Sequence, residues 1–194
     1  DKFCPKIDTM IDKKIFFIVY KVTLDPNKSL DAKEISAIDD FIDFVDAEYR
    51  KLSLQQWAYV FATTFHETAF TFLPIREAFW LSENWRKTNL RYFPYYGRGF
   101  VQITWKENYL KYSKILNEDL VKFPDLAMVP KYAFKILVHG FINGTFTGKK
   151  ITDYINSKAT DYKGARKCIN GTDKDEQIAS YASTFEAILR KSVI

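Results

Sequence analysis

The sequence predicts a mainly α-helical fold, and three observations support this prediction. Apolar residues recur at helical spacing in several segments, strand-like segments are few and short, and the 194 residues include only 7 Gly and 6 Pro. With 47% hydrophobic and 27% charged residues, the composition is that of a globular chain with one sizeable core. It argues against a disordered or fibrous chain.

The first two predicted elements lie within the first 50 residues. Residues 14–24 are β-branched and aromatic, and they fit either a short strand or a buried turn of helix. A helix is expected over 29–50 because apolar residues repeat there at helical spacing, with Asp and Glu on the opposite face. These apolar residues are Ile35, Ile38, Ile42, Val45 and Tyr49.

The third predicted helix begins at a capping box formed by Ser53 and Gln56, and it ends near Glu67. Residues 68–104 form an irregular, aromatic segment, and so long a loop inside a compact domain is usually functional. Further helices are expected over 105–117, 130–143, 150–156, 161–169 and 174–190. Pro130 suits the first turn of a helix.

Charge is distributed unevenly along the chain. Residues 1–50 contain 8 Lys and Arg against 11 Asp and Glu, a net charge of −3, whereas 51–194 contain 21 against 13, a net charge of +8. The basic segment favours an anionic polymer such as nucleic acid, a membrane surface or a bacterial cell wall. A solvated basic face is the simpler alternative. The longest apolar run, 15–20, is far shorter than the roughly 20 residues that span a bilayer.

Cysteine and histidine are scarce. Cys4 and Cys168 are too few for a disulfide scaffold, and free thiols are expected rather than a bridge between them. His66 and His139 are the only histidines, and no Cys/His spacing typical of a zinc site occurs. We therefore expect neither a metal nor an organic cofactor.

Glu67 is the first candidate for chemistry because it closes a strongly apolar helix. A carboxyl group against so much apolar surface should be desolvated, and a desolvated carboxyl can remain protonated near neutrality and act as a general acid. The alternative is a helix-end glutamate bonded to a local arginine or to the backbone.

Glu77 follows ten residues later, next to Arg76, whose charge would favour an ionised carboxylate. Two carboxyl groups in opposite environments form the acid and base pair that glycoside hydrolysis requires. Glu83 is a rival for the role of base, although it lies in a more polar stretch.

A block of short polar and aromatic side chains follows. Gln102 and Thr104 are two residues apart, so in an extended segment they would face the same side, and Asn108 would join them from the next helix. Such groups suit sugar hydroxyls or a positioned water, whereas the simpler alternative is a polar turn that caps a helix. Asn170 is followed by glycine after a short helix, a sequence that also serves as a helix stop.

These motifs together resemble glycoside hydrolase family 19, which contains plant-type chitinases and related phage endolysins. The ordered set is His66-Glu67-Thr68, Glu77, the block from Tyr95 to Thr104 with Asn108-Tyr109, and Ile169-Asn170-Gly171. The resemblance covers residues 53–190. It implies a lysozyme-like domain with two helical lobes around a central cleft. Residues 51–194 would form this catalytic domain, and residues 1–50 an N-terminal helical extension that can pack on it.

The resemblance also implies a role for each matching residue. Glu67 corresponds to the general acid, Glu77 to the general base, and Thr104 to the residue that helps to hold the attacking water. Substrate-binding roles fall to polar residues and one aromatic residue of the cleft. These are Tyr96, Gln102, Asn108 and Asn170.

The short spacing of the carboxylates and the scarcity of cysteines are typical of the microbial and phage branch. We therefore expect a monomeric, inverting muramidase or endolysin that acts on peptidoglycan at the bacterial cell wall. It would be made in the bacterial cytoplasm, because no signal peptide is visible and cysteines are few. The alternatives are a chitinase and a non-catalytic wall-binding or virion module. Nucleic-acid binding is not expected, since the basic residues are dispersed and lack a recognised motif, and neither is membrane insertion.

Overall fold

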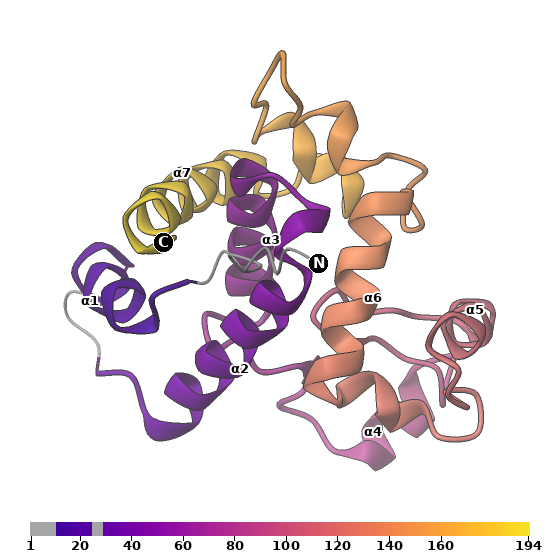
Figure 1. The fold of residues 1–194 in the computed structure, drawn as a ribbon. Helices are drawn as coiled ribbons and strands as arrows, with labels where there is room; N and C mark the ends of the chain where they lie inside the picture. Colours follow the sequence, from indigo (N-terminus) through magenta and orange to yellow (C-terminus); the bar gives the residue numbers. More distant parts are fainter. Residues whose placement is uncertain (1–10, 25–28) are drawn as a thin grey trace, which may run out of the picture.

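The computed structural model describes residues 11–24 and 29–194 and is mainly α-helical (Figure 1). Its two strands pair antiparallel, Ile75 with Gly99 and Arg76 with Arg98, and α4 lies between them in the sequence. This strand pair is called the hairpin below. The elements, in chain order, are α1 (Lys13–Leu24), α2 (Ala32–Glu48), the 3-10 helix η1 (Tyr49–Lys51), α3 (Leu54–Glu67), β1 (Ile75–Arg76), α4 (Glu83–Asn89), β2 (Arg98–Gly99), α5 (Lys106–Leu116), η2 (Pro124–Met128), α6 (Pro130–Asn143), η3 (Ile151–Asp153), η4 (Gly164–Cys168) and α7 (Asp175–Ser192).

Two hydrophobic cores divide the described chain into two lobes. The larger core lies among α1, α2, α3, α6 and α7, and the smaller one lies beside α5 and η2 (Figure 1). Helix α6 serves both, because Leu137 faces the larger core and Ile136 the smaller. The smaller core consists of Ile103, Tyr109, Tyr112, Leu120, Ala127 and Ile136.

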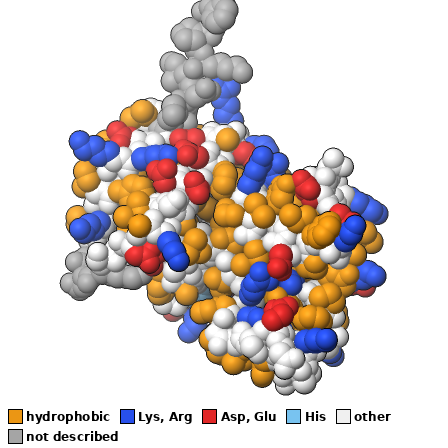
Figure 2. All heavy atoms as spheres, turned by 90° about the horizontal axis from the view of Figure 1, so that it is seen from below, with side chains coloured by type: hydrophobic (Ala, Val, Ile, Leu, Met, Phe, Trp, Pro, Cys, Tyr) orange, Lys and Arg blue, Asp and Glu red, His pale blue; other side chains and the backbone are white. Residues whose placement is uncertain are grey.

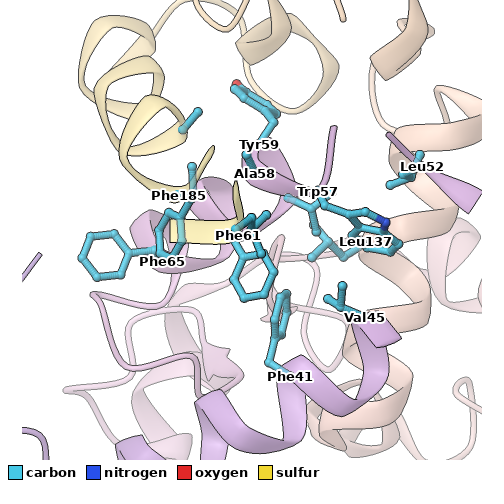
Figure 3. Close-up of a cluster of buried hydrophobic side chains, with 14 of the residues drawn as sticks. Phe41, Val45, Leu52, Trp57, Ala58, Tyr59, Phe61, Phe65, Leu137 and Phe185 are labelled. Carbon is cyan, nitrogen blue, oxygen red and sulfur yellow. The ribbon is translucent and has the colours of Figure 1, made fainter. Parts of the chain in front are cut away.

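Helix α3 is the centre of the larger lobe. Every residue from Gln56 to Phe65 is buried, as expected for a helix that is apolar on all faces. Aromatic rings surround it: the ring centroid of Phe61 lies 5.0 Å from that of Phe41 in α2 and 5.4 Å from that of Phe185 in α7 (Figure 3). Packing on every side therefore fixes where α3 begins and where it ends.

The helices of the first 50 residues pack into this same core. Phe16 and Tyr20 of α1 are fully buried, and the Phe16 ring lies 5.4 Å from that of Phe61. Residues 14–24 are thus helical, which decides between the two predicted alternatives. The predicted helix over 29–50 is confirmed as α2, which begins after a capping box formed by Asp31 and Glu34. The domain boundary at residue 50 stays a prediction.

Two predicted helices are wrong in kind. Residues 150–156 and 161–169 contain only the short 3-10 helices η3 and η4. Side chains compete with the α-helix there: Asn156 Oδ1 accepts from the backbone N–H groups of Lys158 and Ala159, and Asp161 Oδ1 accepts from that of Gly164. The predicted helix over 130–143 is confirmed as α6 with the same bounds.

The irregular segment 68–104 contains one helix that the sequence analysis did not predict. The hydroxyl of Ser82 accepts from the backbone N–H of Trp85 at 3.1 Å and so caps α4. The thiol of Cys168 is buried, whereas Cys4, with which a bridge was considered, lies outside the described residues. In residues 11–24 and 29–194, no helix has the length and apolar character needed to cross a membrane.

We expect Gln56→Ala to lower the free energy of unfolding by about 1–3 kcal/mol, measured by urea denaturation. The Gln56 carboxamide accepts from the backbone N–H of Ser53 at 3.0 Å and donates to the buried carbonyl of Ile155 at 2.7 Å. The substitution removes both bonds and leaves that carbonyl without its partner. Gln55→Ala, at the next position, is the control and should change stability by less than about 0.5 kcal/mol. Equal effects of the two substitutions would contradict this account of the cap.

Candidate active site

Glu67 is the last residue of α3, and its position depends on how that helix ends. The hydroxyl of Thr68 donates to the carbonyl of Thr64 at 2.7 Å and accepts from the backbone N–H of Phe72 at 2.9 Å. Phe70 and Phe72 have φ values of 74° and 57°, in the left-handed region, so the chain turns sharply away from the helix. The Glu67 carboxyl is therefore held at the rim of a buried helix, with 21% of its side chain exposed.

An arginine contacts Glu67. Arg166 Nη1 lies 2.6 Å from Glu67 Oε1, and only 3% of the Arg166 side chain is exposed. Arg166 Nε also donates to the carbonyl of Asp173 at 2.8 Å, which fixes the guanidinium. Glu67 therefore does not face apolar surface alone, and a buried cation is its direct partner. The contact resembles the alternative, a glutamate bonded to an arginine, except that this arginine is 99 residues away in the sequence.

His66 precedes Glu67 and stays largely out of water. Burial lowers the pKa of His66, and the negative charge of Glu67 opposes this effect. Within the described ranges, its Nδ1 atom is buried and makes no hydrogen bond.

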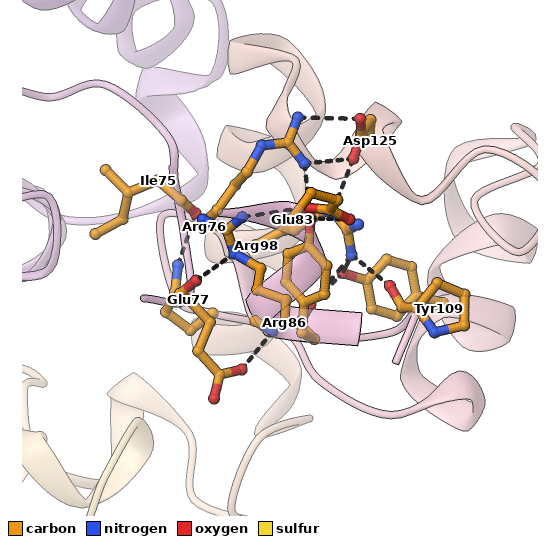
Figure 4. Close-up of polar contacts among 12 residues, drawn as sticks. Ile75, Arg76, Glu77, Glu83, Arg86, Arg98, Tyr109 and Asp125 are labelled. Carbon is orange, nitrogen blue, oxygen red and sulfur yellow. Dashed lines mark hydrogen bonds and ion pairs between the residues drawn. The ribbon is translucent and has the colours of Figure 1, made fainter. Parts of the chain in front are cut away.

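Glu77 comes immediately after β1, and four hydrogen bonds hold it. Its Oε1 accepts from the Tyr92 hydroxyl at 2.5 Å, and its Oε2 accepts from the backbone N–H of Gly97 at 2.9 Å. Its backbone N–H donates to the Gly97 carbonyl at 2.7 Å, and its carbonyl accepts from Arg86 Nε at 2.8 Å (Figure 4). Both the main chain and the carboxylate are thus fixed, and the donors to the carboxylate are uncharged.

Arg76 does not pair with Glu77, contrary to the prediction. Consecutive side chains of a strand point to opposite faces, and Arg76 forms a bidentate ion pair with Asp125 at 2.5 and 3.0 Å (Figure 4). The Arg76 guanidinium lowers the pKa of Asp125. Arg98 adds a third contact, from Nε to Asp125 Oδ1 at 2.9 Å, and so ties the hairpin to η2.

Glu83, the rival base, begins α4 and has a more exposed carboxylate than Glu67. It accepts from the Tyr96 hydroxyl at 2.9 Å and from Arg86 Nη1 at 3.1 Å. Tyr96 itself is fully buried, and the Arg98 guanidinium lies 3.7 Å from its ring centroid. The ring of Tyr96 therefore offers no face to a ligand. Its hydroxyl instead connects Glu83 to the arginine network.

Gln102 lies in a tight turn, not in the extended segment that the sequence analysis predicted. Its φ is 55°, and its carboxamide folds back to donate to the Ile75 carbonyl at 2.8 Å. A Cβ atom on Gly97 would come within 2.7 Å of Gln102 Oε1, so a larger residue here would displace the end of the Gln102 side chain. Gln102 thus closes the hairpin beside Glu77. Its side chain folds back onto Ile75, whereas the side chain of a strand residue would project away from the strand.

Thr104 and Asn108 lie at the start of α5. The Thr104 hydroxyl donates to the Gln102 carbonyl at 2.9 Å, which leaves its oxygen able to accept a further hydrogen bond. Asn108 Nδ2 donates to the Thr104 carbonyl at 2.7 Å, so it caps the turn, as the simpler alternative had it. Its amide oxygen is at an exposed position.

Asn170 follows η4 and is exposed. Its backbone N–H donates to the Arg166 carbonyl at 3.0 Å, so it belongs to the same turn as the partner of Glu67. The structure thus links the predicted residues in two groups. Hydrogen bonds join the hairpin to the start of α5, and Arg166 joins Asn170 to Glu67.

Sequence reasoning missed three residues of this arrangement: Arg166, Asp125 and Tyr92. Arg166 lies four residues before Asn170, so the segment around that motif offered a signal for it. Nothing local marks Tyr92 or Asp125, because their partners lie 15 and 49 residues away. Among the described residues, no group of three or more His, Cys, Asp or Glu is placed to hold a metal ion.

No protein-family model matches the sequence, and no curated protein matches it significantly. Three solved structures are similar. A mutant of chitinase C matches with a TM-score of 0.57 at 19% identity, over 96% of each chain. Chitinase C from Streptomyces griseus HUT6037 matches with a TM-score of 0.56 at 19% identity, over 99% of this chain and 80% of that one.

A bacterial family 19 chitinase, described as differing from the plant enzymes, matches with a TM-score of 0.57 at 20% identity. The match covers 92% of this chain and 94% of that one. Coverage of 96–99% in the two chitinase C structures includes most of the first 50 residues, which the sequence resemblance did not reach. The chain therefore has the mainly α-helical, lysozyme-like fold found in family 19 chitinases.

Proposed function

We propose that the protein is a glycoside hydrolase that cleaves β-1,4 bonds of bacterial peptidoglycan with inversion at the anomeric carbon. One observation carries this proposal: a family 19 chitinase-like fold holds both carboxyl groups that the sequence motifs single out in defined positions. Glu67 ends a buried helix against an arginine, and Glu77 is fixed by uncharged donors. Their roles, Glu67 as the acid and Glu77 as the base, are those that the resemblance of these positions to family 19 implies.

The reaction is a single displacement. Glu67 gives a proton to the glycosidic oxygen as the bond from that oxygen to the anomeric carbon breaks. A water molecule attacks this carbon from the opposite face, and Glu77 takes one of its protons, with the Thr104 hydroxyl oxygen helping to hold the water. Arg166 binds Oε1 of Glu67, so proton donation falls to Oε2. No cofactor takes part in these steps.

The charge of the chain supports peptidoglycan as the substrate. Residues 51–194 have a net charge of +8, which attracts an anionic cell wall, whereas chitin is uncharged. Lys and Arg side chains are spread over the face seen in Figure 2 and do not form one patch, which does not favour nucleic acid. Action at the bacterial wall, as in a phage endolysin, belongs to this same proposal. Chitin is the second candidate, because the similar structures are chitinases.

We expect Glu67→Gln to reduce hydrolysis by about 10²- to 10⁴-fold, the usual contribution of a general acid. The amide keeps an oxygen that accepts from Arg166, so the fold should persist, as checked by circular dichroism. Activity is measured as loss of turbidity of permeabilised bacteria and as release of soluble sugars. Glu176→Gln, which removes the same charge at an exposed site, is the control. Full activity of Glu67→Gln would refute the assignment of the acid, and a folded wild-type protein that binds the wall without hydrolysis would favour a non-catalytic module.

Glu77→Gln and Glu83→Gln decide which residue is the base. We expect a loss of about 10²-fold or more for Glu77→Gln, because the water then has no proton acceptor. Glu83→Gln should retain most activity, since Glu83 Oε2 only accepts from Tyr96 and Arg86. The reverse order of losses would assign the base to Glu83. The same assay, followed by proton NMR, should show a product of inverted anomeric configuration.

The salt dependence of hydrolysis distinguishes peptidoglycan from chitin as the substrate. Wall hydrolysis should fall as ionic strength rises from 0.01 to 0.3 M, because screening shortens the reach of the +8 charge. Hydrolysis of neutral chito-oligosaccharides, if it occurs, should not change with salt. Mass spectrometry of products from purified peptidoglycan identifies the bond. Chito-oligosaccharide release without clearing of bacteria would establish a chitinase instead.

A further inference from the structure

The hydroxyl of Tyr92 is the only side-chain donor to the Glu77 carboxylate in the described part of the chain. It donates to Oε1 at 2.5 Å, while the backbone N–H of Gly97 donates to Oε2 at 2.9 Å. The backbone of Glu77 is separately fixed through Gly97 and Arg86. Tyr92 and the Gly97 N–H together therefore restrict the rotation of the carboxylate, and Tyr92 is the side-chain member of this pair.

Tyr92 is in turn held in place by the turn that precedes α5. Its ring centroid lies 4.9 Å from that of Trp105, and the Arg91 guanidinium lies 5.1 Å from the Trp105 ring. The backbone of Trp105 has a φ of 74°, and its N–H donates to the Tyr95 carbonyl at 2.9 Å. An indole that is 43% exposed thus serves as a support for Tyr92, directly after Thr104 in the sequence.

We propose that Tyr92 is a positioning residue for Glu77, and that it aims the carboxylate at the water held by Thr104. This inference rests on the proposed function. Each carboxylate oxygen has further lone-pair capacity after accepting one hydrogen bond, so a held carboxylate can still accept a proton from water. An uncharged donor orients Glu77 without neutralising it, whereas an arginine in this place would weaken it as a base.

The ionisation of Tyr92 supports this role. Its hydrogen bond to Glu77, followed by burial, raises the pKa of Tyr92 to about 12. The phenol therefore keeps its proton over the whole pH range of a hydrolysis assay, and it donates to Glu77 at every pH in that range. No proton needs to pass from Tyr92 at any step.

The test is Tyr92→Phe, which removes the hydroxyl and keeps the ring against Trp105. We expect kcat to fall by about 10- to 100-fold, the loss for one hydrogen bond to a charged group, with KM changed less than twofold. The pH–rate profile should differ from that of the wild type, because the proposed base loses its side-chain hydrogen-bond donor. Tyr95→Phe is the matched control. Its hydroxyl contacts only the Val121 carbonyl at 3.3 Å, and both kcat and the pH profile should be retained.

A double-mutant cycle separates this inference from the proposed function. In a Glu77→Gln background, Tyr92→Phe should cause no further loss, because the residue acts through Glu77. If Glu77→Gln leaves hydrolysis intact, the assignment of Glu77 as base fails, and this inference fails with it. If Glu77→Gln abolishes hydrolysis while Tyr92→Phe keeps kcat and the pH profile, only the inference is overturned. An equal loss from Tyr92→Phe in both backgrounds would show a merely structural role and would also overturn it.

A measurement that does not depend on enzymatic activity tests the contact between Tyr92 and Glu77 directly. It remains possible even if the Tyr92→Phe variant does not fold. The ring of Tyr92 is labelled with ¹³C and titrated by NMR in the wild type and in Glu77→Gln. Loss of the negative charge should move the ionisation of Tyr92 to lower pH. Titration at the same pH in both proteins would mean that the contact between Tyr92 and Glu77 is absent in solution, and the proposal would be abandoned.

Discussion

The burial of α3 on every side is the constraint on which the rest of the structure depends. Ten consecutive residues, Gln56 to Phe65, are inaccessible to water, so no face of this helix can be left without a partner. Helices α1, α2, α6 and α7 supply these partners, and this accounts for the packing of α1 and α2 into the large core. A helix so enclosed meets solvent at its ends. Its C-terminal end is Glu67, so one packing constraint gives both the lobe and the position of a functional carboxyl group.

The smaller lobe is organised on a different basis. Its apolar core has only six buried residues, and the remaining organisation comes from buried arginines. Arg98 contacts Asp125, the Pro94 carbonyl and the Tyr109 hydroxyl, and so joins the hairpin to η2 and α5. Each buried guanidinium is satisfied by carbonyl, hydroxyl or carboxylate oxygens, which is the condition for burying a charge without a large penalty. Hydrogen bonds and ion pairs are directional, so this network holds the hairpin that carries Glu77 in one defined geometry.

The features that could be predicted from the sequence are those that depend on residues close together in the chain. Helix starts and periodic apolar faces are local, and for that reason the capping box at Ser53 and the bounds of α6 were predicted correctly. Residues 150–156 and 161–169 were predicted as α-helices but contain 3-10 helices, because the side chains of Asn156 and Asp161 accept hydrogen bonds from the nearby backbone. A weak apolar periodicity over a few residues does not reveal such bonds. The order of the motifs along the chain identified the candidate carboxylates. Their partners could not be identified in this way, since Arg166 lies 99 residues from Glu67 and the fold alone brings them together.

The partners of the two candidate glutamates differ in charge. Glu67 contacts a buried cation through Oε1, so its other oxygen is the one available to a ligand, and the cation fixes its direction. Glu77 is oriented by a phenol and a peptide N–H, which restrict rotation but leave the negative charge in place. A base needs that charge, and it needs it pointed at the water. The two uncharged donors come from the segment between α4 and β2, so this segment orients Glu77, the proposed base, while the end of α3 positions Glu67, the proposed acid. The two candidate carboxylates are thus positioned by different forces: the position of Glu67 depends on apolar packing, and that of Glu77 depends on hydrogen bonds.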